Sequence, residues 1–225
     1  MQEKTETGPD LYLLLSLLLV ILMYPVLDHG FLRRLMLGLL MFVPVILATV
    51  RLSQIKGWLW LTVPLMSGVF IFSAADTFFP SRVLDGTKWV LVAAFLALSV
   101  VGLFSFLKCA RSVLNAHLHA AVSIYLLLGL GWFALYSAIE NFYGGAILRS
   151  NSTAMADRPS ELLYFSLVTL STIGYGDIVP LYAEVRILAA LEGMTGVLYA
   201  AITVALLVSA YKPQSTSQEG QSTAP

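Results

Sequence analysis

The chain has 225 residues, of which 58% are hydrophobic and 12% charged, and its mean hydropathy is +0.83. These values exclude a soluble globular domain and predict a protein embedded in membrane lipid. The formal net charge is zero, so the composition offers no argument for a nucleic-acid partner, and a single cysteine leaves no intrachain disulfide.

Six apolar runs are candidate membrane spans, because a spanning helix needs about 20 largely apolar residues. They cover 11–27, 35–50, 57–75, 89–107, 120–139 and 182–211. The first two are slightly short and are separated by a tight-turn sequence, Asp28-His29-Gly30, so a re-entrant hairpin is an alternative to two full spans. We predict an all-α polytopic membrane protein with six transmembrane helices.

The fourth run, 89–107, contains no charged residue. A voltage-sensing helix needs several regularly spaced Arg or Lys, so we expect no strong voltage dependence from this segment. Near the outer ends of the third and fourth runs, Asp76 is expected to pair with Arg82 or Lys88. Basic residues are shared almost equally between alternate loops, so their distribution does not fix the orientation in the membrane.

The runs and the polar segments between them divide the chain into five parts. We predict a polar N-terminus at 1–10, a four-helix membrane domain without gating charges at 11–108, and a polar linker at 109–119. A second membrane domain at 120–211 and a disordered tail at 212–225 follow. His117 and His119 are expected to be solvated linker residues, with a proton-sensing role as the alternative.

A short helix is predicted over 160–170, after Pro159 and with Glu161 near the positive end of its dipole. Its length of about 16 Å is too short to cross a bilayer, so it should enter the membrane and stop there. Its C-terminal end would then direct partial negative charge at the membrane centre, which favours a cation.

The segment Thr172-Ile173-Gly174-Tyr175-Gly176-Asp177 follows this helix. A dehydrated cation needs a ring of oxygens in place of its water, and main-chain carbonyls can supply it only if successive peptides point the same way. Glycines at 174 and 176 accept the backbone angles that this requires. We predict that the carbonyls of 172–175 and the Thr172 hydroxyl form layers of oxygen, with Tyr175 turned away from the axis to brace the loop.

The stretch YFSLVTLSTIGYGD, from Tyr164 to Asp177, resembles the pore helix and selectivity filter of the potassium channel superfamily. The resemblance extends over 120–211 and is greatest to short bacterial members with a two-helix pore unit. It implies passive K+ conduction, K+ ions bound by the filter, no organic cofactor, and a place in a bacterial inner membrane with both termini cytoplasmic. Position 168, a glutamate in some members, is valine, so gating through that carboxylate is in doubt.

The chain contains one filter motif, whereas a ring of carbonyls needs four, so we expect a homotetramer. Gating candidates lie on the last helix. Gly196 stands where the family has a hinge glycine, although close helix packing explains it equally well. Glu192 lies deep in the membrane and is either a carboxyl hydrogen-bonded behind the filter or a group that makes opening pH-sensitive. Val208 and Tyr211 are candidates for a narrow apolar gate.

Three other functions were weighed against a selective channel. A membrane enzyme would need convergent polar groups within the spans, and the helix interiors offer almost none. A regulatory subunit of another channel is disfavoured by the intact filter sequence. A poorly selective cation channel is the nearest rival.

Overall fold

The computed structural model describes residues 9–24, 47, 58–108, 115–149 and 159–210. These residues form six helices and two short strands. In chain order they are α1 (Pro9–Met23), α3 (Trp58–Phe78), α4 (Arg82–Lys108), α5 (Asn115–Tyr143), β1 (Ile147–Arg149), α6 (Pro159–Leu170), β2 (Ile178–Pro180) and α7 (Ala183–Ala210). Most of the second predicted run, 35–50, the tail at 212–225 and most of the N-terminus lie outside the described residues.

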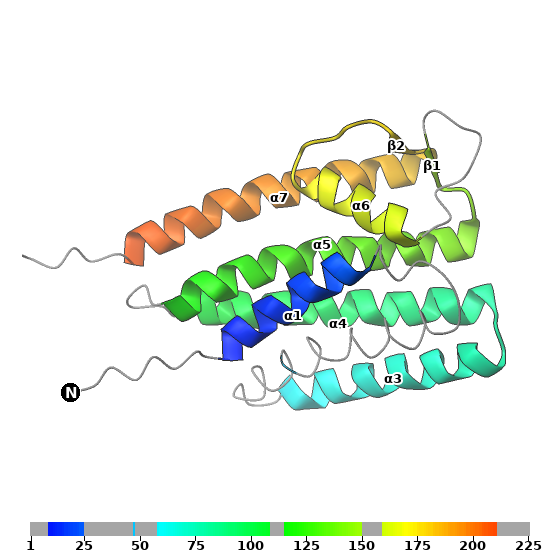
Figure 1. Cartoon of the computed structure of the whole chain (residues 1–225), viewed down its shortest axis with the longest axis horizontal. Helices are drawn as coiled ribbons and strands as arrows, with labels where there is room; N and C mark the ends of the chain where they lie inside the picture. Colours follow the sequence, from blue (N-terminus) through cyan, green and yellow to red (C-terminus); the bar gives the residue numbers. More distant parts are fainter. Residues whose placement is uncertain (1–8, 25–46, 48–57, 109–114, 150–158, 211–225) are drawn as a thin grey trace, which may run out of the picture.

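The long helices lie side by side and alternate in direction (Figure 1). Helix α5 is central: it packs against α4 and α1 on one side and against α6 and α7 on the other, while α3 packs on α4. The first residues of α1 and the last residues of α7 lie at the same end of the bundle, opposite the loop that follows α6. Through α5, the N-terminal helices and the C-terminal unit share one core.

Three stretches of the described chain have the length and hydropathy of membrane spans, namely Arg82–Ser105, His117–Tyr143 and Ala183–Ser209. Two shorter apolar helices, Asp10–Met23 and Trp60–Asp76, accompany them. The chain is therefore an integral membrane protein with a predominantly helical fold. The two strands were not predicted, and they qualify the expectation of an all-α structure.

Phe133 of α5 is the point at which three helices meet. Its ring is 1% exposed, and it makes edge-on contacts with Tyr24 at the end of α1 (5.2 Å between centroids) and with Trp89 of α4 (5.1 Å). Such pairs contribute about 0.5–1.5 kcal/mol each beyond the area they bury. They fix the N-terminal helices to α5 close to the level at which α5 meets α6.

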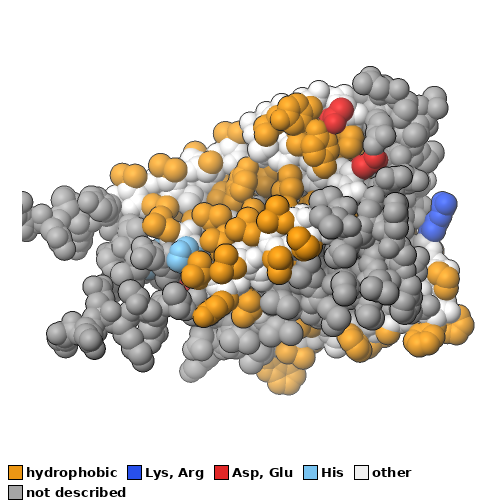
Figure 2. Space-filling view, viewed as in Figure 1, with side chains coloured by type: hydrophobic (Ala, Val, Ile, Leu, Met, Phe, Trp, Pro, Cys, Tyr) orange, Lys and Arg blue, Asp and Glu red, His pale blue; other side chains and the backbone are white. Residues whose placement is uncertain are grey.

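Apolar side chains cover much of the described surface on the face shown in Figure 2, and the few acidic and basic side chains visible there lie toward the end of the bundle that holds the loop after α6. Helix α7 has the longest exposed apolar face. Its members are Ile187, Leu191, Met194, Val197, Leu198, Ile202, Val204 and Val208. Burial within one chain does not explain these residues, whereas contact with lipid or with further copies of the chain does.

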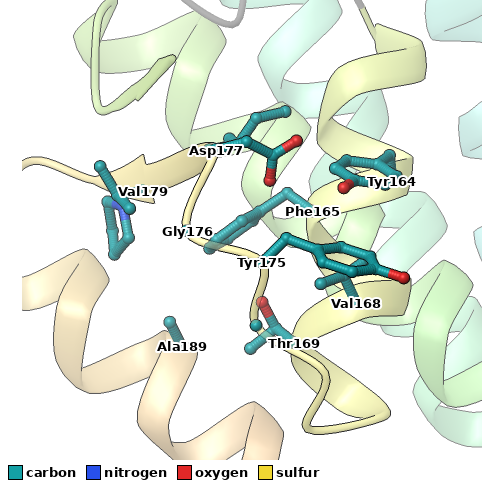
Figure 3. A pocket seen from close by; sticks show the side chains of 12 residues that line it. Tyr164, Phe165, Val168, Thr169, Tyr175, Gly176, Asp177, Val179 and Ala189 are labelled. Carbon is teal, nitrogen blue, oxygen red and sulfur yellow. The ribbon is translucent and has the colours of Figure 1, made fainter. Parts of the chain in front are cut away.

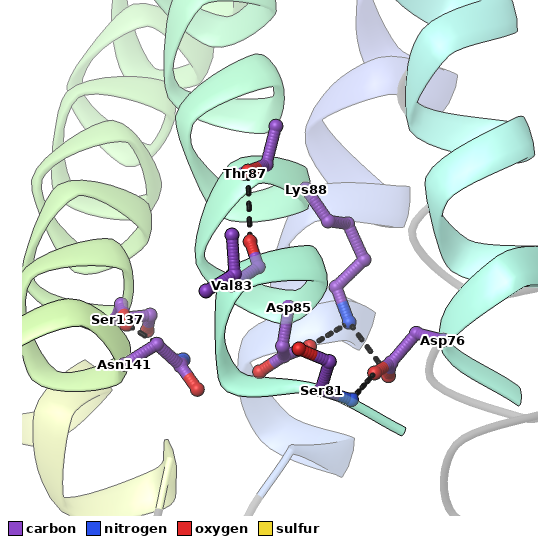
Figure 4. Close-up of polar contacts among 8 residues, drawn as sticks. All are labelled: Asp76, Ser81, Val83, Asp85, Thr87, Lys88, Ser137 and Asn141. Carbon is purple, nitrogen blue, oxygen red and sulfur yellow. Dashed lines mark hydrogen bonds and ion pairs between the residues drawn. The ribbon is translucent and has the colours of Figure 1, made fainter. Parts of the chain in front are cut away.

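Asp76, at the end of α3, and Asp85, in α4, share one lysine (Figure 4). Lys88 Nζ pairs with the Asp85 carboxylate and lies 3.8 Å from Asp76 Oδ2. The Ser81 N–H, in the turn between the helices, donates to Asp76 Oδ1 at 3.5 Å. Of the two partners predicted for Asp76, the structure confirms Lys88.

The predicted linker before the last two spans ends earlier than expected. Helix α5 begins at Asn115, so both histidines lie in its first turns rather than in a solvated loop. His117 is 7% exposed and His119 is partly buried. The prediction of a solvated His117 is therefore wrong, because the helix continues past the apolar run and packs its polar start against the protein.

Candidate functional site

Helix α6 stops part-way along the bundle, and the loop that contains residues 172–177 begins at its end (Figure 1). It has 12 residues, a length of about 18 Å, and starts one residue before the predicted position. The chain then folds back on the helix: the N–H groups of Ile173 and Gly174 both donate to the Val168 carbonyl, at 3.0 and 3.4 Å, and Thr172 N–H donates to Thr169 O at 3.0 Å. The end of α6 thus provides acceptors for these amides. Val168 contributes to the loop through its main-chain carbonyl, not through its side chain.

The backbone of the loop alternates in an uncommon way. Thr172, Gly174 and Gly176 have φ angles of 59°, 55° and 76°, so every second residue is left-handed. Glycine adopts this conformation without strain, but a β-branched residue such as threonine does so rarely. Strained backbone of this kind costs on the order of 1–3 kcal/mol and clusters at functional sites. Thr172 is therefore the residue at which the loop departs most from ordinary geometry.

The side chains of the loop are open in a single chain. Ile173 and Tyr175 are 55% and 69% exposed, and a Cβ added at Gly174 or Gly176 would meet nothing within 4 Å. The Tyr175 ring lies parallel to that of Tyr164 in α6, with 6.4 Å between centroids (Figure 3). Tyr175, which was predicted to brace the loop, therefore contacts Tyr164 of α6.

A recess of about 240 Å³ lies between the loop, α6 and α7 (Figure 3). It is lined on one side by α6 and on the other by the loop and by Ala189 of α7. The Tyr164 hydroxyl faces the Asp177 carboxylate at its outer end. The recess is open on one side in the single chain, so another copy of the chain could close it.

The far end of the loop is held by β2, which pairs antiparallel with β1. Leu181 N–H extends this pairing by donating to Ala146 O at 2.8 Å. Glu140, in the last turn of α5, accepts hydrogen bonds from Gly145 N–H (2.5 Å) and Ala146 N–H (3.0 Å) and so fixes the start of β1. The sequence analysis missed Glu140. The Gly144-Gly145 pair shortly after a carboxylate was the signal that could have indicated it, since both glycines have positive φ.

Glu192 of α7 is fully buried at the junction of three helices. Its Oε2 accepts a hydrogen bond from Tyr136 Oη of α5 at 2.7 Å, and its Oε1 lies 2.6 Å from Ser166 Oγ of α6. Ser166 Oγ also donates to Gly129 O of α5 at 2.8 Å. Glu192 is therefore a hydrogen-bonded group buried behind the loop, and its two partners come from distant parts of the sequence.

Residues 137–212 match the family model described as an ion channel. These residues are therefore an ion channel domain of the potassium channel type. The matched region starts in the second half of α5 and includes α6, the loop and α7, whereas Gly129 and Tyr136, the α5 partners of Ser166 and Glu192, lie before it. No curated protein and no solved structure matches the chain.

Gly196 of α7 packs directly against the end of α6. A Cβ at position 196 would lie 1.9 Å from the Leu170 carbonyl oxygen at the end of α6. At Gly193, by contrast, an added Cβ would be 3.6 Å from Thr169 O, an ordinary contact. The structure thus supplies the packing explanation for Gly196 that the sequence left open beside the hinge.

The other two gating candidates lie near the end of α7. Val208 is 68% exposed within one chain, and Tyr211 lies outside the described residues. An apolar constriction at this end of the channel stays a prediction.

Proposed function

We propose that this ion channel is selective for K+ and conducts it passively through a pore shared by four copies of the chain. The ions bind to the carbonyl oxygens of residues 172–175 and to the Thr172 hydroxyl, while Gly176 and Asp177 form the outer end of the filter. The observation that carries the proposal is the alternation of left-handed backbone at Thr172, Gly174 and Gly176.

Alternate left-handed residues turn successive peptides to the same side of the chain, as a column of carbonyl ligands requires. The amides of 172–174 are already bonded to the end of α6, so the carbonyls of the loop are the groups left for an ion. The same helix end contributes partial negative charge. Each feature favours a cation stripped of water, and none of them needs an organic cofactor.

The exposure of the loop in a single chain supports a homotetramer. Irregular backbone at membrane depth is tolerated only where protein buries it or where it lines water. A lone chain leaves Ile173 and Tyr175 more than half exposed, together with the apolar face of α7. Four chains around a common axis provide the carbonyl ring and cover these surfaces.

We further propose that the channel depends weakly or not at all on voltage and that both termini are cytoplasmic, in the inner membrane of a bacterium. The span of α4 lacks charge between Trp89 and Leu107, which supports the first point. The start of α1 and the end of α7 lie at the same end of the bundle, away from the loop after α6, which supports the second point (Figure 1).

Ion flux into liposomes that contain only this protein tests the proposal. We expect K+ flux to exceed Na+ flux clearly in the native channel. Gly174→Ala should remove this preference, because alanine in the left-handed region costs about 1–2 kcal/mol in each subunit. Gly131→Ala is the matched control, since its Cβ would only touch Leu96 at 3.8 Å.

Two outcomes would overturn the proposal. Equal fluxes of K+ and Na+ through the native protein would identify a poorly selective cation channel. A tetramer that passes no ion under any pH or voltage would instead indicate a regulatory subunit.

A further inference from the structure

The carboxyl group of Glu192 has no exposure to solvent, and its polar contacts are hydroxyl groups. Among the described residues, no Lys, Arg or His lies within 4.0 Å of it to form an ion pair. Of the titratable groups in the described part of the chain, Tyr125 and Tyr136 of α5 interact electrostatically with it. On α6, Tyr164 instead faces Tyr175 and the loop.

The hydrogen atoms available at this junction can be counted. Three short contacts must each be bridged by one proton: Tyr136 to Glu192, Glu192 to Ser166, and Ser166 to Gly129 O. The tyrosine and the serine supply one proton each, and the carbonyl of Gly129 supplies none. An ionised Glu192 therefore leaves one contact without a proton, whereas a protonated Glu192 fills all three.

One arrangement satisfies every contact. Tyr136 donates to Oε2, the protonated Oε1 donates to Ser166 Oγ, and Ser166 donates to Gly129 O. The three helices α5, α6 and α7 are then joined by a continuous chain of hydrogen bonds. Burial of a carboxylate without a cation would cost several kcal/mol, and this arrangement avoids that cost.

We infer that Glu192 is held as a neutral carboxylic acid and is a positioning residue that fixes α6 between α5 and α7 only while it carries its proton. When the proton is lost, the Ser166 hydroxyl can donate either to the carboxylate or to Gly129 O, so one of the two hydrogen bonds breaks. The buried charge also attracts water into the junction. Since the proposed filter begins directly after α6, a shift in the position of this helix also displaces Thr172. Conduction should therefore fall as the pH rises.

Infrared spectroscopy of the full-length protein tests the protonation state independently of any flux. We expect the native protein at neutral pH to show a carboxylic-acid C=O stretching band that is missing from Glu192→Gln. Glutamine keeps the bond from Tyr136 and can donate N–H to Ser166, so this variant should assemble normally. The matched control is Glu184→Gln, an exposed position on the same helix, which should keep the band.

Flux and thermal unfolding over a range of pH test the positioning role. The native channel should lose K+ flux and thermal stability at alkaline pH, and Glu192→Gln should keep both, because an amide has no proton to lose there. Ser166→Ala should weaken the response by removing the link to Gly129. The flux measurement rests on the proposed function, whereas the infrared and unfolding measurements do not, so the two proposals can fail separately.

The inference is overturned if no band is lost in Glu192→Gln, if the variant keeps the alkaline decline in stability, or if it fails to assemble. The last result would mean that the site requires a charge, which a neutral side chain of the same shape cannot supply.

Discussion

Replacement of Gly196 by alanine separates a packing role from a hinge role. The new Cβ would lie 1.9 Å from the Leu170 oxygen, whereas an ordinary contact starts at 3.4 Å. Helix α7 must therefore move away from α6 by about 1.5 Å. The obstacle is a backbone carbonyl at a helix end rather than the tip of a flexible side chain, so it cannot rotate aside.

The magnitude follows from two opposing terms. Alanine is favoured over glycine inside a helix by about 0.8–1 kcal/mol, which alone would stabilise α7. Overpacking against a rigid wall costs about 1–3 kcal/mol and more where the backbone must move. We therefore expect Gly196→Ala to destabilise each subunit by at least about 1 kcal/mol.

Gly193→Ala is the control, since it receives the same gain in helix propensity without the clash. The two variants should differ in sign: Gly193→Ala neutral or more stable than the native protein, and Gly196→Ala less stable. Thermal unfolding of the purified protein in detergent, followed by size-exclusion chromatography of the oligomer, measures the difference. An unchanged stability of Gly196→Ala combined with altered opening would refute the packing argument and restore the hinge.

Two further predictions concern the ends of the channel domain and its N-terminal helices. Glu140→Ala should destabilise the connection between α5 and β1 by about 1–3 kcal/mol, because the buried amides of Gly145 and Ala146 lose a charged acceptor. The variant should also have lower K+ selectivity, and native selectivity in the liposome flux assay would contradict this. Current through the native channel in planar bilayers free of blocking ions should rise smoothly with voltage, since α4 has no charge between Trp89 and Leu107. A steep conductance-voltage curve would contradict this.

The part of the site that could be predicted is the part that is local in sequence. The short helix, the glycine spacing and the need for left-handed backbone all follow from residues 159–177, and no distant contact is required to define them. Glu192 could be recognised as an unusual charge for the same reason, because a carboxylate inside an apolar run is costly wherever its partners are.

The partners themselves could not be predicted, because tertiary packing selects them. Tyr136 lies 56 positions from Glu192 and Ser166 lies 26 positions away, and neither residue type is rare in a membrane helix. The strands β1 and β2 have three residues each and carry too little pattern to identify. The choice between hinge and packing at Gly196 likewise depends on where the end of α6 comes to rest.

The pairing of β1 with β2 limits how the loop between α6 and β2 can change shape. The seven residues from Ser171 to Asp177 are attached at one end to α6, which packs against α7, and at the other to β2. Strand β2 pairs with β1, and the last turn of α5 holds the start of β1. A segment this short with both ends immobilised has no slack for swinging out of the ion path. If this segment is the proposed filter and it interrupts the current, it must do so by rotation of single peptide planes while its two ends stay in place.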